Sequence, residues 1–342
     1  MNILQKSSTP KYLNKKRAGY SVIIFTVLAL LLLICFVVSL LLGSTVINPI
    51  FAVKSLWTGD FSSTDFKILF YLRLPRALGG LLAGSALGVA GTIVQGVLAN
   101  PLASPGTIGV NAGAGLGAVI LIALFPSAVY LIPLGAFLGG VGALLIILAI
   151  NSKKGCGKIS LILVGIAVGS TLTAAQSLIK SLFPDAAYDA TLFSVGTLSG
   201  LSFKSLFPSA YLILGGVALC FILTRALDLL SLGEAAAHSL GVRVKKLSFL
   251  MLLLAAILAS CAVSFSGLLG FVGLIAPHIG RKIVGGKHSL LVPFCALFGG
   301  FMVLLSDLLA RTLFTPYEIP VGIILSFIGC PFFVLLIISK RN

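Results

Sequence analysis

Apolar runs of about twenty residues recur from one end of this 342-residue chain to the other, and they constrain its fold more than any other feature. A helix of about twenty residues spans the roughly 30 Å of hydrocarbon in a bilayer. Only 9% of the residues are charged, so the chain lacks the charge to cover a water-facing surface. We therefore expect an all-α, polytopic membrane protein.

Ten such runs predict ten transmembrane helices in a single bundle with short loops. They cover residues 20–43, 74–98, 108–125, 130–150, 159–182, 206–223, 247–265, 268–284, 290–308 and 319–338. The first run is longer than the apolar core of a signal peptide and no A-x-A site follows it, so it is expected to be retained. Residues 1–19 then form a cytoplasmic tail, and residues 20–342 form one transmembrane domain.

Basic residues are unevenly distributed between the two sides of the predicted bundle. With the N-terminus inside, 17 Lys and Arg residues fall in inner segments and 7 in outer ones. This is the direction that the positive-inside rule requires. An even number of helices places both termini in the cytoplasm, and the net charge of +16 reflects orientation in the bilayer rather than nucleic-acid binding.

Glycine and proline indicate how the helices pack and where they break. Glycines four residues apart in 80–88, 109–117, 135–139 and 165–169 would let neighbouring backbones approach closely. Segments 100–106, 273–278 and 329–331 carry proline and are expected to disturb helices. Such breaks persist at membrane depth only where protein or a water-filled cavity covers them, which favours a transporter over a passive anchor.

Residues for metal binding or catalysis are sparse. The six cysteines form no C-x-x-C motif, and the three histidines, His238, His278 and His288, show no metal-ligand spacing. Residues 155–160 have the wrong spacing for a phosphate-binding loop. We therefore expect no metal site, no cofactor and no ATP hydrolysis by this chain alone.

Short motifs follow one another over nearly the whole chain after the first predicted helix. They are residues 73–76 (RLPR), 84–95, 100–105 (NPLASP) with Gly109, 232–242 (LGEAAAHSLGV), 270–278 (GFVGLIAPH) with Arg281, Asp307 with Arg311, 318–322 (EIPVG) and 329–332 (GCPF). In number, order and spacing these motifs resemble those of the FecCD-type permeases, which serve the iron-siderophore, haem and cobalamin ABC importers. One segment departs, since Phe193-Ser194-Val195-Gly196-Thr197 stands where the family usually has Trp-x-x-Gly-Ser.

The resemblance implies a type II ABC importer permease that moves a ferric siderophore across the cytoplasmic membrane and is not an enzyme. Haem and cobalamin permeases share these motifs and stay alternatives. The implied partners are a second permease subunit, identical or homologous, two cytosolic ABC ATPases and an extracytoplasmic binding protein.

A secondary transporter is the more distant alternative. Such a transporter usually carries acidic residues within its membrane helices, whereas here the eight acids lie in predicted loops or at helix ends. An intramembrane protease would need a serine in a GxSG setting with a histidine at similar depth, and neither is found.

Residues 225–246 form the predicted cytoplasmic loop between the sixth and seventh helices. Glu234 suits the first turn of a short helix, alanines favour helix, and Gly241 fits a C-cap. An interfacial helix that only anchors the loop is one interpretation. The resemblance implies instead a coupling helix that docks in a groove of the ATPase, with Leu232, Gly233, Glu234, Ala235, Ala236, Ala237, Ser239, Leu240 and Gly241.

Three arginines, Arg73, Arg76 and Arg311, fall on the predicted outer face, where the positive-inside rule disfavours them. The resemblance implies that they face the binding protein and pair with its acids, whereas local ion pairing, above all of Arg311 with Asp307, is the alternative.

Weakly polar residues are candidates for the wall of the translocation path and equally for helix packing. They are Gln95, Asn100, Asn111, Thr171 and Gln176, and the segment 193–200, with Phe193 and Gly196, is a further candidate.

Overall fold

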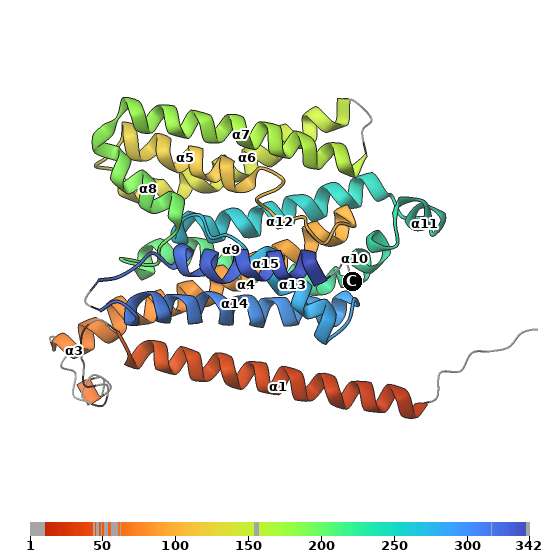
Figure 1. Cartoon of the computed structure of the whole chain (residues 1–342), viewed down its shortest axis with the longest axis horizontal. Coiled ribbons are helices and arrows are strands. Elements are labelled where there is room, and N and C mark those ends of the chain that lie inside the picture. The colour runs from red at the N-terminus through yellow and green to blue at the C-terminus, as the bar shows by residue number, and fades with distance from the viewer. Residues whose placement is uncertain are drawn as a thin grey trace, which may run out of the picture.

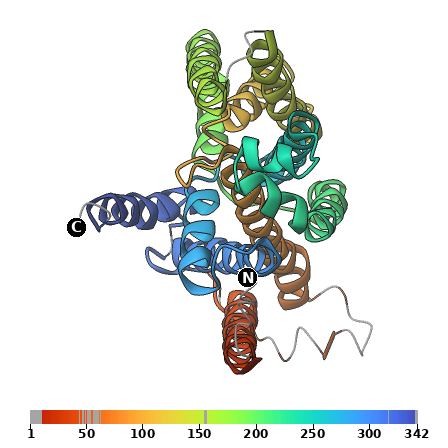
Figure 2. The same ribbon diagram turned by 90° about the vertical axis from the view of Figure 1, so that its right-hand side faces the viewer.

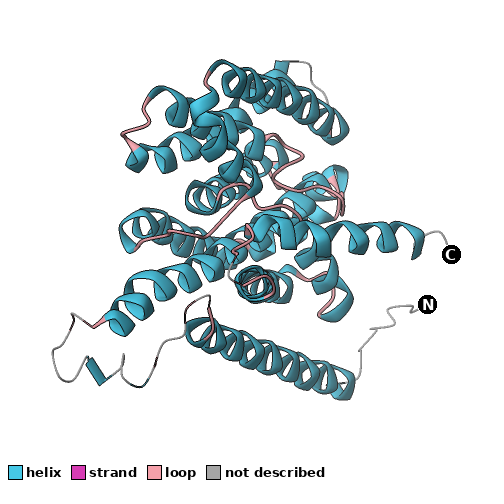
Figure 3. Ribbon diagram, turned by 60° about the vertical axis from the view of Figure 1, so that its left-hand side comes forward, coloured by secondary structure: helices cyan, strands magenta, loops and turns pink. Residues whose placement is uncertain are grey.

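The computed structural model describes residues 11–43, 45, 48, 50, 54–55, 61, 63–153, 157–315 and 317–339. Within these residues every regular element is a helix and no strand occurs (Figure 3). The longer helices are α1 (Lys11–Leu41), α4 (Leu74–Leu98), α5 (Val110–Leu124), α6 (Ile132–Lys153), α7 (Lys158–Leu182), α9 (Phe203–Ile222), α12 (Val244–Ser266), α13 (Val272–Ile283), α14 (His288–Thr312) and α15 (Val321–Ser339). The shorter ones are α3 (Thr64–Lys67), the π-helical η1 (Ile68–Arg73), η2 (Val129–Leu131), η3 (Pro184–Ala186), α8 (Ala187–Val195), α10 (Thr224–Ser231) and α11 (Glu234–Ser239).

Each of the ten predicted transmembrane runs coincides with one of the ten longer helices. Seven helical segments of the described chain are long and apolar enough to cross a membrane, and α5 and α15 add shorter apolar helices. The prediction that residues 268–284 form a full transmembrane helix is corrected by the structure. The helix in this segment, α13, has 12 residues, which is about 18 Å at 1.5 Å per residue. As a helix it therefore does not cross the hydrocarbon alone.

The helix that carries the RLPR motif begins earlier than predicted. α3, η1 and α4 run without interruption from Thr64 to Leu98, so Pro75 lies inside a long helix and not in its first turn. In η1 the N–H of Leu74 bonds to the carbonyl of Leu69, five residues back. We attribute the continuity to this wider π turn, which accommodates a proline that would otherwise break the helix.

One of the three predicted interruptions is present as a break. Residues 99–109 leave the helix, with positive φ angles of 50° at Ala99 and 76° at Gly109. By contrast, Pro277 and Pro331 lie inside the continuous helices α13 and α15. Because Pro277 has no N–H, the carbonyl of Gly273 loses its helical donor. Gln95 Nε2 donates to that carbonyl at 3.3 Å instead.

Small residues bring the central helices into backbone contact, as their spacing predicts. α4 is buried along most of its length and packs against α14, α12 and α13. At the closest points an added Cβ atom would overlap the facing backbone. The contacting pairs are Gly84–Gly299, Gly88–Cys295, Gly91–Gly273, Gly113–Gly139 and Gly117–Gly135.

The long helices lie side by side along one direction, with α11 at one end of the bundle and α3 at the other (Figure 1). Viewed from the end, α4 runs through the interior, α1 lies on the outside, and α15 projects from the side (Figure 2). α1 packs against α14 and exposes leucine, isoleucine and valine over much of its surface, as a lipid-facing helix should. The assignment of the α11 end to the cytoplasm stays a prediction.

Candidate functional site

The loop between α9 and α12 carries α10 and α11 at one end of the bundle (Figure 1). α11 begins at Glu234, which confirms the predicted first-turn position. At its other end the N–H of Gly241 donates to the carbonyl of His238 at 2.9 Å, and the N–H of Val242 donates to that of Ala237 at 3.1 Å. These paired bonds, with a φ of 81° at the glycine, form a Schellman cap and confirm the predicted C-cap.

α11 presents an apolar surface away from the bundle. Ala237 faces inward and is fully buried, whereas Leu232 and Leu240, at the two ends of the helix, are each 62% exposed. Ala235 and Ala236 between them are also exposed. Exposed apolar patches mark sites of interaction with other proteins or with lipid. The use of this patch as an ATPase docking surface stays a prediction.

A hydrogen-bonded contact fastens α10 to the start of α14. Asp228 of α10 accepts a hydrogen bond from the backbone N–H of His288 at 2.9 Å, and its carboxylate lies 2.7 Å from the His288 imidazole Nδ1. The ring is buried, and its Nε2 packs against Gly96 near the end of α4. α10 therefore joins the loop between α9 and α12 to two central helices.

From the sequence, His288 was not expected to bind a metal, and Asp228 was not singled out. The available signal was charge: Asp228 and Glu234 are the two acids that fall on the predicted inner side, where basic residues dominate.

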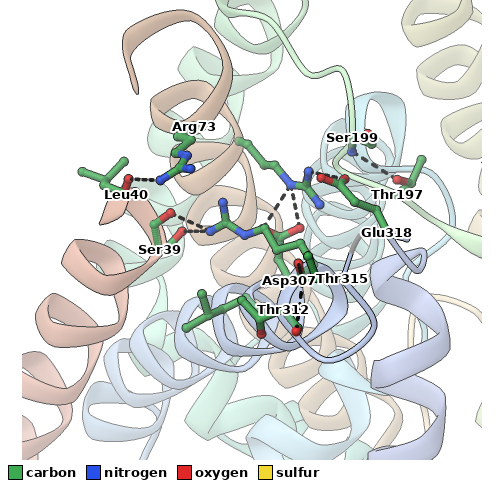
Figure 4. Close-up of polar contacts among 12 residues, drawn as sticks. Ser39, Leu40, Arg73, Thr197, Ser199, Asp307, Thr312, Thr315 and Glu318 are labelled. Carbon is green, nitrogen blue, oxygen red and sulfur yellow. Dashed lines mark hydrogen bonds and ion pairs between the residues drawn. The ribbon is translucent and has the colours of Figure 1, made fainter. Parts of the chain in front are cut away.

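At the opposite end of the bundle an ion-pair network links α4 and α14 (Figure 4). Arg76 Nε donates to Asp307 Oδ1 at 2.9 Å, and Arg76 Nη1 donates to Glu318 Oε2 at 2.8 Å. Asp307 Oδ2 also lies 3.5 Å from Arg311 Nε. Asp307 lies near the end of α14, and its side chain is fully buried. Two guanidinium groups, those of Arg76 and Arg311, compensate its charge there.

Two of the three arginines cap the end of α1. Arg311 Nη2 donates to the carbonyl and hydroxyl oxygens of Ser39 at 2.7 and 2.6 Å. Arg73 Nη1 donates to the carbonyls of Leu40 and Leu41 at 2.9 and 2.6 Å, and its Nη2 donates to Thr45. The last carbonyls of a helix lack intrahelical donors and carry partial negative charge, so cations are favourable there.

These contacts turn the arginines inward. Arg73 is 4% exposed and Arg311 is 3% exposed, contrary to the expectation that all three face outward. Arg76, with 12% of its side chain exposed, and Glu318, with 32%, reach the surface. The local pairing considered as the alternative is present. Docking of a binding protein at these arginines stays a prediction.

Asn111 and Gln176 are the path candidates that the structure brings together. Both line a cavity of about 810 Å³ beside α5 and α7, and Gln176 Nε2 donates to the carbonyl of Ala112 at 2.9 Å. Asn111 Oδ1 is buried and finds no hydrogen-bond donor among the described residues. The other polar side chains on the cavity wall are Ser104, Thr107, Ser170, Thr173, Ser177, Lys180 and Ser194.

Three other path candidates lie outside this cavity. Gln95 is buried between α4 and α13, where its Oε1 accepts a hydrogen bond from Arg281 Nη1 at 2.5 Å. Asn100 stabilises its own loop by accepting from the N–H of Leu102 at 2.9 Å. Thr171 is exposed on another face of α7 and bonds to the carbonyl one turn back.

Phe193 and Gly196 also lie away from the cavity beside α7. Phe193 lines a different cavity, of about 640 Å³, beside α8 and η2. Gly196, with a φ of 87°, ends α8 and packs against the backbone at Leu268. The assignment of both residues to the translocation path stays a prediction.

Comparison with known proteins gives one consistent result. The sequence profile of the FecCD transport family matches residues 31–339. The Fe(3+)-citrate import system permease protein YfmE of Bacillus subtilis (strain 168) is 38% identical over 91% of this chain and 93% of its own length. The hemin transport system permease protein HmuU of Yersinia pestis is 37% identical over 91% of this chain and 95% of its own. A solved chain described as an inward-facing conformation of a metal-chelate type ABC transporter superposes with a TM-score of 0.82, at 31% identity over 92% of this chain and 99% of that one.

Proposed function

This chain belongs to the FecCD transport family, and from that premise we propose that it carries a ferric siderophore across the cytoplasmic membrane. It is a multi-pass membrane permease subunit of an ABC importer and not an enzyme. A relative named for ferric citrate, an iron chelate, supports the iron cargo. A relative of nearly equal identity named for hemin makes haem the second candidate.

The observation that carries the proposal, besides family membership, is the exposed apolar surface of α11. The chain has no phosphate-binding loop of its own, so a separate ATPase must supply the driving force. Leu232 and Leu240 would enter a groove on that ATPase. Asp228 would pass the movement of the loop to α14 through its contact with His288.

The rest of the complex follows from the same proposal. A second permease, identical or homologous, completes the path. An extracytoplasmic binding protein delivers the chelate at the end of the bundle where Arg76 and Glu318 reach the surface. Arg73 and Arg311 would support that docking surface from beneath, because they hold α1 against it. Both termini would lie in the cytoplasm.

The test is iron uptake by the assembled transporter. The chain is co-expressed with its ATPase, partner permease and binding protein and reconstituted in proteoliposomes. Uptake of radioactive iron is then measured with ferric citrate, a ferric catecholate, a ferric trihydroxamate and hemin. We expect ATP-dependent uptake of at least one of these substrates. No uptake of any of them by an assembled complex that hydrolyses ATP would contradict the proposal, and uptake of hemin alone would favour the second candidate.

A further inference from the structure

A polar stripe runs along one face of α7, and the described part of the chain leaves it exposed. Ser170, Thr173 and Ser177 are exposed and recur at helical spacing on the wall of the 810 Å³ cavity. The hydroxyls of Thr173 and Ser177 donate to the carbonyls of Gly169 and Thr173 one turn back, which leaves their oxygens as acceptors on the cavity wall. A helix face that gathers several polar groups at membrane depth is favourable beside water or protein rather than lipid. On the proposed function, this cavity is part of the translocation path.

The polar stripe of α7 ends at the positively charged side chain of Lys180. Lys180 lies in the last turn of α7 and on the wall of the same cavity. Its position is ten residues after Ser170, or about 15 Å further along the helix at 1.5 Å per residue. The cavity therefore has small hydroxyl side chains along its length and a lysine at the end nearer α8.

Ser194 of α8 holds the lysine in place. Lys180 Nζ donates to Ser194 Oγ at 2.9 Å, and Ser194 Oγ in turn donates to the carbonyl of Ala190 at 2.7 Å. The Ser194 hydroxyl therefore donates its proton to the backbone carbonyl, and the Ser194 oxygen accepts the hydrogen bond from the lysine ammonium group. An ammonium has three donors, so two N–H groups of Lys180 remain for a ligand.

Ser194 also joins two cavities. A second cavity, of about 660 Å³, lies beside α15 and shares Asn111, Ser194 and Leu268 with the first. The lysine therefore lies close to the place where the polar wall of α7 meets the more apolar wall formed by α15. A ligand at the junction of the two walls would lie close to Lys180.

Lys180 has no carboxylate partner among the residues that the structure describes. The nearest acids in sequence, Asp185 and Asp189, line the separate cavity beside η2. An uncompensated cation at the wall of a cavity attracts anions and disfavours cations.

We propose that Lys180, positioned by Ser194, is the residue of the path that selects anionic ferric chelates, those with free carboxylate or catecholate charge, over neutral trihydroxamate chelates. Asn111 lies on the wall of the same cavity, and its amide NH2 group can donate to such a ligand as a second polar contact. This inference rests on the proposed function and narrows its substrate class.

The experiment compares Lys180→Gln, Lys180→Glu and Lys180→Arg in the complete reconstituted complex. Initial rates of iron uptake are measured with ferric citrate, a ferric catecholate, hemin and a neutral ferric trihydroxamate. We expect the wild-type complex to move an anionic chelate. Lys180→Gln should lower that rate about tenfold, the order expected for one charge interaction at intermediate dielectric. Lys180→Glu should lower it further, and Lys180→Arg should retain most of it.

Lys204→Gln is the matched control. Lys204 is exposed at the start of α9 and lies outside both cavities, so its replacement should leave the rates unchanged. Complex yield and ATP hydrolysis are measured for every variant, so that a rate is compared only between assembled transporters. The inference is overturned if the wild type moves only the neutral chelate, or if Lys180→Gln moves anionic chelates at the wild-type rate. Neither result would affect the proposed function, which is contradicted only if an assembled complex that hydrolyses ATP moves none of the four substrates. Uptake of hemin alone would favour its second candidate.

Discussion

Gly84 of α4 and Gly299 of α14 face each other backbone to backbone, so closely that a Cβ atom on either would overlap the carbonyl oxygen of the other. This contact lies in the middle of the pair of helices that also carries Arg76 and Asp307 near one end and Gly96 and His288 near the other. The proposed docking end and the proposed coupling end are therefore connected by two helices that cannot separate or slide without breaking close contacts.

Replacing Gly84 with Ala should destabilise the complex. The added methyl group meets backbone atoms of Gly299 and Gly300, which cannot rotate away. Overpacking of this kind typically costs about 1–3 kcal/mol. Thermal unfolding of the purified protein in detergent should show a lower midpoint. Gly215→Ala, on an open face of α9 with no atom within 4 Å, is the control and should be neutral or slightly stabilising. An unchanged midpoint for Gly84→Ala would contradict the close helix contact.

Removing the carboxylate of Asp228 should weaken the connection between the coupling loop and α14. Asp228→Ala leaves the N–H of His288 and its buried ring without their acceptor, at a cost of about 1–3 kcal/mol. We expect the ATPase to remain bound while iron moved per ATP hydrolysed falls. Asp228→Asn keeps an oxygen that can accept from the N–H and should retain more of the coupling. Normal transport per ATP in Asp228→Ala would exclude this contact from the coupling mechanism.

The number and type of the long helices could be predicted from sequence because length and hydropathy report directly on the crossing of a bilayer. The length of α13 could not, because its run of apolar residues includes the irregular segment before Val272. The continuity of α13 through Pro277 was also not predicted. It involves Gln95 of another helix, which donates a hydrogen bond to the carbonyl of Gly273.

The candidate sites divide in the same way. The cap of α11 was predictable because Glu234 and Gly241 act within their own helix. The burial of Arg73 and Arg311 was not, because their acceptors are carbonyls at the end of α1, which local sequence does not reveal. Among the path candidates, a polar side chain looks the same in sequence whether it faces a cavity, as Asn111 does, or holds two helices together, as Gln95 does.

The cap of α11 gives a test of ATPase docking. Gly241 has a φ of 81° and no atom within 4 Å of an added Cβ, so a substitution there acts through backbone strain and not through a clash. Gly241→Val should strain or unwind the cap, since left-handed backbone costs a residue with a Cβ about 1–2 kcal/mol. We expect less ATPase to co-purify with the permease. Gly241→Asn, which tolerates this conformation, should retain it, and equal retention by both variants would argue against docking at α11.

Glu234→Lys tests the proposed ATPase-docking surface of α11 by reversing the charge in its first turn. Glu234 is exposed in the first turn of α11, where a negative charge is favourable and a positive one is not. The variant should insert normally and either lose the ATPase or hydrolyse ATP without transport. Normal assembly together with normal transport would show that this turn of α11 is not part of the contact.

Asp307 should be essential for assembly of the bundle. Asp307→Asn removes the charge that compensates Arg76 and Arg311 inside the protein. Breaking a buried pair on one side typically costs about 3–5 kcal/mol. The yield of folded complex should fall sharply. Glu318→Gln removes the more exposed partner of Arg76 and should cost at most about 1 kcal/mol. Equal yields for the two variants would contradict a structural role for the buried pair.

The two ends of the bundle should lie on opposite sides of the membrane, with α11 inside. Thr315 follows α14 at the end that holds the arginine network, and Ser152 lies near the end of α6 toward α11; both residues are exposed. In a background without native cysteines, Thr315→Cys should react with an impermeant thiol reagent on intact cells that lack an outer barrier, whereas Ser152→Cys should react only after the cells are opened. Lys287→Cys, exposed just before α14, is a second inner position and should behave as Ser152→Cys does. The proposed ATPase surface and the proposed binding-protein surface lie at these two ends. The reverse labelling pattern would therefore overturn the ATPase assignment at the α11 end and the binding-protein assignment at the arginine end, although the fold itself would be unaffected.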